Sequence, residues 1–562
     1  MSAALNPTAS KSGNNIARHL ANMARLQASR PAVICASGRD AAGAVAYSQL
    51  TFRELEESSN QLASTLDAIG IRRGVRAALM VPPSLDFFTL TFALFKVGAV
   101  PVLIDPGIGL AQLRGCLAHA RPEAFIGITK AHAARVILGW ARSSVRINVT
   151  VGPRLFWGGH TLASLRRCSP ASPSMSAVEP EPDETAAILF TSGSTGAPKG
   201  VVYTHEIFNA QVDHIRALYR IEPGEIDLAT FPLFALFGPA LGMTAVVPEM
   251  DASRPASADP VNIISAIEKF GITNMFGSPA LINRVGRHGE ANKITLPSLR
   301  RAISAGAPVP AKILARFAGM LPAGAQVFTP YGATECLPVA SIGSDEILGE
   351  TRRQTDNGAG VCVGRPVRGL TAKVIRISDG PIDEWSDSLE LPTGEVGEIV
   401  VKAAHATSSY FDLPAATLLA KIQDPVNGSL YHRMGDVGYF DSGGRLWFCG
   451  RRAHRVVSSD QTRFSIPCEG VFNVHPKVFR TALTGVPQNG TINPVLCVEL
   501  EAGVPSEAQD SVREELLALG AAHAHTRAIK TILFHPAFPV DVRHNAKIFR
   551  EKLGAWAAEK LQ

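Results

Sequence analysis

Short apolar segments alternate along this chain with longer stretches in which apolar residues recur at helical spacing. A run of about four to eight apolar residues between polar ones is typical of a strand buried on both faces. Such strands alternating with amphipathic helices predict an α/β protein with mostly parallel strands, because each parallel connection needs a crossover segment. The runs that carry this prediction are Arg76–Val81, Ala99–Ile104, Ala186–Phe190 and Ile272–Phe276.

The chain has 562 residues, which is too long for one ordinary core, so two or more domains are expected. A polar, basic stretch follows Gly450 and opens a segment long enough for a small α+β domain. We therefore expect a large domain with parallel α/β subdomains over residues 1–450. A small, mobile α+β lid domain is expected over residues 451–562.

Charge and cysteine usage exclude some partners. The 55 Lys and Arg residues nearly balance 49 Asp and Glu residues, and the formal charge of +6 is spread along the chain. We therefore expect no nucleic-acid partner, while a modest preference for anionic substrates or surfaces is allowed. The eight cysteines show no CxxC pair and no metal-ligand spacing, which favours reduced thiols in a cytoplasmic protein.

No targeting or membrane segment is expected. The amino terminus lacks the continuous apolar stretch of a secretory signal, and residues 17–27 predict a short amphipathic helix. The segment Leu228–Pro248 carries no charge and is long enough to span a bilayer. Its three prolines, Pro232, Pro239 and Pro248, would break such a helix, so we expect a buried strand, a turn and a helix start instead.

The strongest single motif is a loop of hydroxyls, glycines and one lysine after Phe190. Glycines let backbone N–H groups approach phosphate oxygens, the hydroxyls donate hydrogen bonds, and Lys199 adds a positive charge. The loop is not a Walker motif, because Pro198 stands where that motif needs its second glycine. It predicts a phosphate-chain site, the alternative being a flexible Ser/Gly loop; the residues are Thr191, Ser192, Gly193, Ser194, Thr195, Gly196 and Lys199.

This loop resembles the phosphate loop of the adenylate-forming superfamily, which includes acyl-CoA synthetases, peptide-synthetase adenylation domains and luciferases. The other motifs of that family follow in order, from about Asn60 to Arg550. The resemblance implies ATP-dependent activation of a carboxylic acid as acyl-AMP, with pyrophosphate released and Mg²⁺ required. The implied catalytic residues are Lys199, Thr334, Glu335 and Lys547.

Two further segments are assigned to the nucleotide by this resemblance. Tyr331–Glu335 resembles the aromatic-Gly-x-Thr-Glu motif, in which Tyr331 would stack on adenine, while Gly332 and Ala333 line the site. Thr334 would bond the α-phosphate and Glu335 would hold Mg²⁺, for which a hard oxygen ligand is suited. Alone, this pentapeptide is also typical of an exposed turn. The segment that would pack against adenine and the acyl group is Ser304–Pro308, with Gly306, Ala307 and Pro308.

Three charged residues complete the implied site. Asp436 lies in a segment similar to the family's Thr-Gly-Asp region, whose aspartate chelates both ribose hydroxyls. Arg451 matches the arginine of the Gly-Arg pair, which contacts ribose or phosphate. Lys547 matches the adenylation lysine, which would neutralise charge between the carboxylate and the α-phosphate. Alone, Asp436 would more often be a turn residue and Lys547 a solvated helix residue.

The acceptor of the acyl group decides the function. In acyl-CoA synthetases an Asp or Lys forms the hinge of the small domain, and here Ala453 takes that position. The loop Val457–Arg463 lacks the glycine that makes room for pantetheine, so thioester formation is not expected. The apolar segment Phe231–Phe237 and the residues after it favour a tunnel for a long alkyl chain, ordinary core being the alternative. The candidate pocket residues are Phe234, Phe237 and Met243.

The segment from Met434 to Val456, with Pro467–Glu469 and His475–Pro476, is similar to the β-lactone synthetases of bacterial long-chain olefin biosynthesis. The resemblance implies that the substrate is a long-chain 2-alkyl-3-hydroxy acid. Its own 3-hydroxyl would attack the acyl carbon of the acyl-AMP and give a β-lactone and AMP. Because imidazole titrates near neutrality, His454 and His205 are candidate bases, although a structural role is the simpler interpretation of His205.

Two other functions stay open. A long-chain fatty acyl-CoA or acyl-AMP ligase would need a different acceptor, and a thiol requirement would identify it. A non-catalytic nucleotide-binding protein would show no exchange of pyrophosphate into ATP. The resemblance implies a strongly hydrophobic substrate. Such a substrate favours a cytoplasmic enzyme that is peripheral to a membrane, or one that works in an assembly with other olefin-pathway enzymes.

Overall fold

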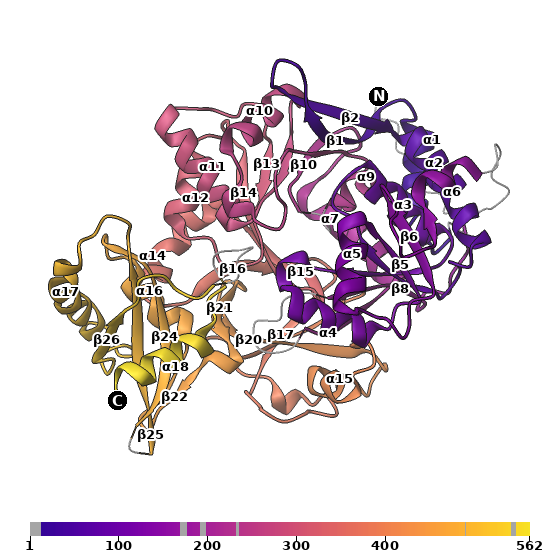
Figure 1. Cartoon of the computed structure of the whole chain (residues 1–562). Helices are drawn as coiled ribbons and strands as arrows, with labels where there is room; N and C mark the ends of the chain where they lie inside the picture. Colours follow the sequence, from indigo (N-terminus) through magenta and orange to yellow (C-terminus); the bar gives the residue numbers. More distant parts are fainter. Residues whose placement is uncertain (1–12, 169–176, 191–197, 232–234, 489, 541–546) are drawn as a thin grey trace, which may run out of the picture. The chain divides into compact units, whose positions relative to one another are not determined.

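The computed structural model describes residues 13–168, 177–190, 198–231, 235–488, 490–540 and 547–562 (Figure 1). Their backbone divides into two compact units. The first unit contains the described residues up to 249, together with residues 410–412. The second unit contains residues 250–409 and the described residues from 413 onward. Both units combine helices with sheets, so the predicted α/β class is confirmed.

A seven-stranded sheet forms the centre of the first unit, in the order β7-β6-β5-β3-β4-β8-β9. All neighbouring strands in it are parallel except β8 and β9. Three of the predicted runs are strands of this sheet. The strands are β3 (Arg76–Met80), β4 (Val100–Ile104), β5 (Ala124–Ile128), β6 (Ile147–Val151), β7 (His160–Thr161), β8 (Thr185–Phe190) and β9 (Gly200–Thr204).

The helices of the first unit pack on one another or on strands, and side-chain caps fix the start of two of them. Thr51 caps α2 through a capping box with Glu54, and Ser84 caps α3. Helices α1, α2, α3 and α6 form one packed group, while α4 and α5 contact strands of the sheet (Figure 1). The helices are α1 (Arg18–Leu26), α2 (Phe52–Ala68), α3 (Leu85–Lys96), α4 (Leu110–Ala120), α5 (Thr129–Leu138), α6 (Leu162–Cys168) and α7 (His205–Tyr219).

The uncharged segment Leu228–Pro248 contains a strand, a short helix and a second strand. These are β10 (Ile226–Ala229), α9 (Phe237–Leu241) and β11 (Thr244–Val247). The two strands pair in parallel. Strand β11 also pairs in parallel with β1 (Pro31–Arg39), which pairs antiparallel with β2 (Val45–Thr51). The prediction of a broken, buried segment is confirmed. Within the part of the chain that the structure describes, no helix has both the length and the apolar character needed to cross a membrane.

The second unit begins with parallel strands and continues with antiparallel ones. Its strand order is β12-β13-β14-β15-β16-β21-β20-β18-β17, with β19 paired to β20. Helices α10 (Pro260–Phe270), α11 (Pro279–Asn292) and α12 (Ala311–Ala318) alternate with the first strands. The strands are β12 (Asn274–Phe276), β13 (Arg301–Ile303), β14 (Gln326–Ala333), β15 (Cys336–Gly343), β16 (Val361–Pro366), β17 (Thr371–Ile375), β18 (Gly397–Lys402), β19 (Lys421–Gln423), β20 (Leu430–Phe440) and β21 (Leu446–Arg451).

Residues after 450 form a sheet and cores of their own within the second unit. The strands β24 (Val478–Gln488), β25 (Thr491–Leu500) and β26 (Thr531–Phe534) form a three-stranded sheet. Helices α16 (Ser465–Asn473), α17 (Gln509–Ala521) and α18 (Arg550–Lys560) accompany it (Figure 1, gold to yellow). Two apolar clusters in this part consist wholly of residues beyond 450, among them Phe472, Leu496 and Leu516 in one and Phe538 and Leu553 in the other.

Candidate active site

The motif Tyr331–Glu335 forms the end of a tight hairpin. Strands β14 and β15 are antiparallel, and Ala333 pairs with Cys336, so Thr334 and Glu335 form a two-residue tip. A side chain at position 332 would approach the Cys336 carbonyl oxygen to 2.6 Å, which explains the glycine there. The hairpin therefore presents the predicted phosphate and Mg²⁺ residues together, both half-buried.

Tyr331 on β14 meets Asp436 and Arg451, which lie on the paired strands β20 and β21. The Tyr331 hydroxyl donates a hydrogen bond to Asp436 Oδ2 at 2.8 Å. Asp436 on β20 lies opposite Arg451, the last residue of β21, and Arg451 Nη1 is 2.9 Å from Asp436 Oδ1. The Tyr331 ring also packs on Phe448, with ring centroids 5.9 Å apart. The fold thus brings together three residues that the sequence assigned to one nucleotide.

Burial dominates the electrostatics of this cluster. Loss of solvent raises the pKa of the Asp436 carboxyl, while Arg451 and the Tyr331 hydroxyl act in the opposite direction. Burial and the neighbouring carboxylate raise the pKa of Tyr331 well above its usual value, so its hydroxyl remains a donor. Among the described residues, the buried Ser304 Oγ makes no hydrogen bond, and Asp436 Oδ1 has Arg451 as an ion-pair partner without a hydrogen bond. These acceptors and donors fit a polar ligand such as a nucleotide.

We expect Asp436→Asn to weaken ATP binding by about tenfold to a hundredfold. The amide keeps the shape of the side chain but loses the charge and one acceptor oxygen, so it cannot accept both ribose hydroxyls. Calorimetric titration with ATP measures this change. Tyr331→Phe is the matched variant, since it keeps the ring and removes only the hydroxyl, and it should weaken binding far less. An equal loss in both variants would contradict the assignment of Asp436.

The phosphate loop lies between two described strands. Strand β8 leads into it and β9 leaves it, with Phe190 opposite Gly200. Residues Thr191, Ser192, Gly193, Ser194, Thr195 and Gly196 lie outside the described residues. The exposed Lys199 lies over the Tyr410 ring, with its Nζ 4.8 Å from the ring centroid. This cation–π contact holds the predicted phosphate-binding lysine at the end of the loop.

The segment assigned to adenine, Ser304–Pro308, follows β13 directly. Its backbone turns at Gly306, where φ is +101°, a conformation that favours glycine. Ser304 is buried and its amide donates to the Phe328 carbonyl oxygen of β14 at 2.9 Å, so the segment starts beside the strand that carries Tyr331. Beyond this turn, Ala307 is partly exposed and Pro308 is exposed.

A buried lysine, Lys421, is a residue that the sequence analysis missed. It is the first residue of β19, and its Nζ donates to the Thr407 carbonyl oxygen. The Thr407 amide in turn donates to the Glu335 carbonyl oxygen at 2.8 Å. Burial lowers the pKa of Lys421 to about 8, while the charges of Glu335 and Cys336 oppose the shift. Lys421 belongs to no recognisable motif; a lysine among apolar residues at a strand start was the available signal.

The pKa of Lys421 predicts a pH dependence of stability. An unfolded lysine titrates near 10.5, so between about 8 and 10.5 the unfolded chain binds more protons at this residue than the folded chain. Its contribution to the free energy of unfolding therefore rises with pH over this window, by at most about 1.4 kcal/mol per pH unit. In urea unfolding, the free energy of unfolding of the wild type should therefore rise relative to that of Lys421→Met as the pH increases from about 8 to 10.5. Lys560→Met, at an exposed position, should show no such trend.

Lys547 lies in a locally anchored segment before α18. Ile548 forms a β-bridge with Val540, and the Phe549 amide donates to the Pro539 carbonyl oxygen at 2.9 Å. At the start of α18, Arg550 forms an ion pair with the buried Glu469, with an Nη1–Oε1 distance of 2.5 Å. The predicted adenylation lysine therefore lies between two fixed points, while residues 541–546 lie outside the described part.

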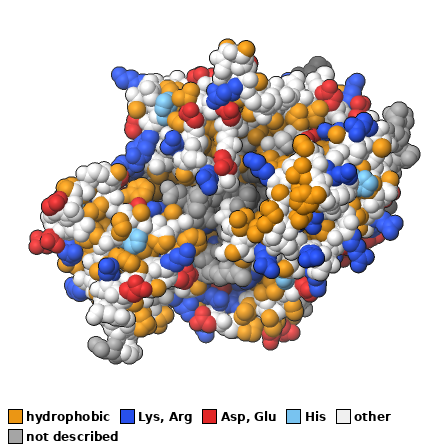
Figure 2. All heavy atoms as spheres, in the orientation of Figure 1, with side chains coloured by type: hydrophobic (Ala, Val, Ile, Leu, Met, Phe, Trp, Pro, Cys, Tyr) orange, Lys and Arg blue, Asp and Glu red, His pale blue; other side chains and the backbone are white. Residues whose placement is uncertain are grey.

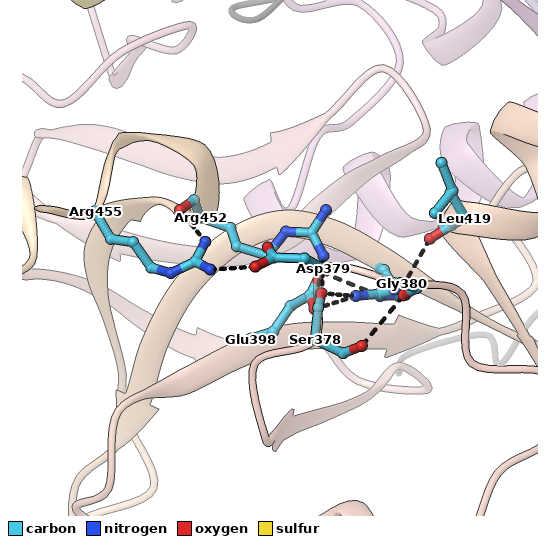
Figure 3. A network of polar contacts seen from close by, with 8 residues as sticks. Ser378, Asp379, Gly380, Glu398, Leu419, Arg452 and Arg455 are labelled. Atoms are coloured by element: carbon cyan, nitrogen blue, oxygen red, sulfur yellow. Dashed lines mark hydrogen bonds and ion pairs between the residues drawn. The ribbon is translucent and has the colours of Figure 1, made fainter. Parts of the chain in front are cut away.

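The predicted hinge, Ala453, is exposed and lies between two anchored arginines (Figure 3). Arg455 pairs with Asp379 at 2.6 Å, and Arg452 Nη1 lies 3.5 Å from Glu398 Oε2 and bonds the Ser378 carbonyl oxygen. Glu398 also pairs with Arg433 at 2.7 Å, and both of these side chains are 1% exposed. The backbone around the hinge is thus tied to β18 and to the loop before it.

Both histidines proposed as bases have defined partners. His454 Nε2 lies 3.3 Å from Glu551 Oε1 of α18, and burial and the Arg550 charge lower its pKa to about 4. His205 is buried; its Nδ1 accepts a hydrogen bond from the Ile16 amide at 3.2 Å, and burial lowers its pKa to about 4. With a pKa of about 4, either ring is neutral at physiological pH but only a weak base, so the titration near neutrality expected from the sequence is not found, and the Nδ1 atom of His205 is already engaged.

The loop without glycine after the hinge is a closed hairpin. Strands β22 (Val456–Val457) and β23 (Thr462–Arg463) pair with each other, and the Ser458 amide donates to the Gln461 carbonyl oxygen at 3.1 Å. Arg463 is buried and forms two bonds to Asp460, of 2.9 and 2.5 Å. This hairpin stands where the resemblance places the pantetheine loop.

The candidate acyl pocket is described in part. Phe234 lies outside the described residues. Phe237 begins α9 and packs on Phe208, with ring centroids 6.5 Å apart, and Phe208 in turn contacts Phe95 and Tyr203. Met243 is buried between α9 and β11. Apolar and aromatic side chains therefore continue beyond Phe237, in agreement with either a tunnel wall or ordinary core.

Comparison with known proteins connects this geometry to a family. The sequence pattern of the family described as AMP-binding enzyme matches residues 20–411. The chain belongs to the AMP-binding enzyme family. The resemblance to adenylate-forming enzymes predicted from the motifs is confirmed.

Relatives of this AMP-binding enzyme cover almost all of its length. An olefin β-lactone synthetase of Xanthomonas campestris pv. campestris is 51% identical over 97% of this chain and 98% of its own. One of Stenotrophomonas maltophilia is 50% identical over 98% of this chain and 99% of its own. The crystal structure of ATP-bound MatB from Rhodopseudomonas palustris is 20% identical, covers 98% of this chain and 100% of its own, and has a TM-score of 0.78. This last similarity shows a shared fold.

The side chains present fit a nucleotide better than a preformed metal cage. No group of three or more His, Cys, Asp or Glu residues that could hold a metal ion occurs in the described ranges. Mg²⁺ is commonly bound by one or two carboxylates together with substrate phosphates, so the single carboxylate of Glu335 is compatible with it. On the face shown in Figure 2, blue and red side chains are interspersed, as expected for a chain whose charges nearly balance.

Proposed function

We propose that this AMP-binding enzyme converts a long-chain 2-alkyl-3-hydroxy carboxylic acid into a β-lactone through an acyl-AMP intermediate. The observation that carries the proposal is identity of 51% and 50%, over nearly the full length, to two olefin β-lactone synthetases. Two differences from acyl-CoA synthetases support the proposal: Ala453 at the hinge position and the hairpin without glycine that follows it. An attacking hydroxyl within the substrate needs no path for pantetheine.

In the first step the substrate carboxylate attacks the α-phosphorus of ATP, and the bond to pyrophosphate breaks. Tyr331, Asp436 and Arg451 would hold adenine and ribose, and the loop with Lys199 would hold the phosphates. Glu335 would hold Mg²⁺ with phosphate oxygens, and the ion would offset phosphate charge. Lys547 would lie between the carboxylate and the α-phosphate, where its charge offsets the repulsion between them.

In the second step the 3-hydroxyl oxygen attacks the acyl carbon, the bond to AMP breaks, and the hydroxyl proton leaves to a base. Hydroxyl and acyl carbon belong to one molecule, so the step gains from proximity. His454, with its neutral ring, is our candidate for that base. The strain of a four-membered ring is offset by the good leaving group, AMP.

We also propose that residues 451–562 act as a lid that carries Lys547 to the site. The separate apolar clusters of this part and its position after Arg451 support the proposal. Because substrate and product would both be strongly hydrophobic, we expect the enzyme to act in an assembly with other olefin-pathway enzymes or at a membrane surface. These enzymes would supply the hydroxy acid and consume the lactone.

Incubation with ATP, Mg²⁺ and a synthetic long-chain 2-alkyl-3-hydroxy acid, with and without coenzyme A, tests the function. A β-lactone and AMP formed without coenzyme A are expected, and NMR identifies the ring. A thioester formed only with coenzyme A would assign the protein to the acyl-CoA ligases. If no acid supports exchange of pyrophosphate into ATP, the protein binds nucleotide without catalysing adenylation.

A further inference from the structure

The first unit exposes a group of large apolar side chains, here called the apolar patch. It consists of Val136, Ile137 and Leu138 at the end of α5, and Leu155 and Phe156 in the loop after β6. Ile137 and Phe156 are each 77% exposed. Isolated exposed apolar residues are ordinary, but a group of this size marks a contact surface.

Packing beneath the apolar patch joins its two segments. Trp157 stacks on His132 of α5, with ring centroids 5.4 Å apart and planes inclined by 8°. The Thr129 hydroxyl donates to the Pro153 carbonyl oxygen at 2.6 Å. Residues four apart share a helix face, so Val136 follows His132 next to the stacked rings. The loop and the helix therefore present their apolar side chains as one fixed surface.

The sequence segment that carries the apolar patch has only positive charges, and one of them, Arg166, is paired with Asp86 of α3. Between Glu123 and Glu179 the chain contains no Asp or Glu. No ion pair among the described residues involves Lys130, Arg142, Arg146 or Arg154. Figure 2 shows apolar side chains bordered by blue ones over the region where Figure 1 labels α5. The cations of this stretch are Lys130, Arg135, Arg142, Arg146, Arg154, Arg166 and Arg167.

We propose that the apolar patch and its cations bind an anionic phospholipid surface. Apolar and aromatic side chains enter the boundary between headgroups and acyl chains, while Lys and Arg remain at the headgroups. Each basic residue near an anionic leaflet adds attraction, and a stretch without carboxylates adds no repulsion. The proposal stands apart from the identity of the acid, because it rests on the surface alone.

Flotation of the full chain with phospholipid vesicles tests the proposal. Vesicles of phosphatidylcholine mixed with phosphatidylglycerol should bind the chain, pure phosphatidylcholine should bind it much less, and salt should weaken binding. Ile137→Ser with Phe156→Ser, and separately Arg142→Glu with Arg154→Glu, should each lower vesicle affinity by at least about tenfold. Pyrophosphate exchange should stay unchanged in both, which shows that they fold.

Val426→Ser with Arg527→Glu is the matched control. Val426 is 88% exposed, Arg527 is also exposed, and both lie outside the apolar patch. This variant carries the same kinds of change and should bind vesicles like the wild type. The proposal is overturned if the wild type does not float, if it binds neutral vesicles equally well, or if the control loses as much affinity as the patch variants. These outcomes do not depend on which acid the enzyme activates.

Discussion

Replacement of Lys547 by alanine is expected to lower the rate of acyl-AMP formation by about a hundredfold to a thousandfold. Two negative groups must approach each other in this step, and removal of a positioned positive charge leaves their repulsion uncompensated. Exchange of labelled pyrophosphate into ATP measures the step without any need to detect the final product. The affinity for ATP should change much less, because the nucleotide contacts at Tyr331, Asp436 and Arg451 remain.

Lys560→Ala provides the control for this prediction. Lys560 ends the same helix, α18, that begins after Lys547, and its side chain is exposed. It should therefore keep the wild-type rate. If Lys547→Ala also kept that rate, the assignment of the carboxyl-terminal motif would be wrong.

Glu398→Gln is expected to lower the free energy of unfolding by about 3 to 5 kcal/mol. The glutamine has nearly the same shape, but it leaves the charge of Arg433 buried without a carboxylate. Arg433 would keep its bonds to the carbonyl oxygens of Ser378, Gly380 and Leu419, which neutralise no charge. Urea unfolding measures the change.

A surface pair gives the comparison for this second prediction. Glu249 pairs with Arg39 at 2.5 Å, and the two side chains are 34% and 50% exposed. Because exposed pairs contribute little, Glu249→Gln should cost less than about 1 kcal/mol. Replacement of both Arg433 and Glu398 by methionine should cost less than Glu398→Gln alone, since no charge stays buried. Equal losses at the buried and the surface pair would show that the burial of Arg433 has little effect.

Local patterns predicted much of this fold. The runs that became β3, β4, β8 and β12 were visible because a strand buried on both faces must be apolar throughout. Prolines in Leu228–Pro248 excluded a membrane helix, and the structure has two strands and a short helix there. The order of the nucleotide motifs predicted the family, since each motif combines residue types that phosphate or ribose requires.

These local patterns could not predict which residues far apart in the sequence contact each other. Tyr331 and Asp436 are 105 positions apart, and their hydrogen bond depends on how several strands are ordered in one sheet. Lys421 approaches Glu335 for the same reason, although its local sequence is ordinary. The arginines around Ala453 were recognised as a basic stretch, yet their partners Asp379 and Glu398 lie far earlier in the chain. Sequence spacing alone gives no account of such partners.

The hydrogen bond and ion pair of Asp436 also bear on which sugars the site accepts. A pocket rejects a ligand that lacks a hydroxyl most strongly when the missing group would leave a buried charge without partners. Here the Tyr331 hydroxyl and Arg451 already contact the two oxygens of Asp436. With a 2′-deoxynucleotide bound, the Asp436 carboxylate would still be contacted by the Tyr331 hydroxyl and by Arg451. We therefore expect the enzyme to discriminate only modestly between ATP and its 2′-deoxy form.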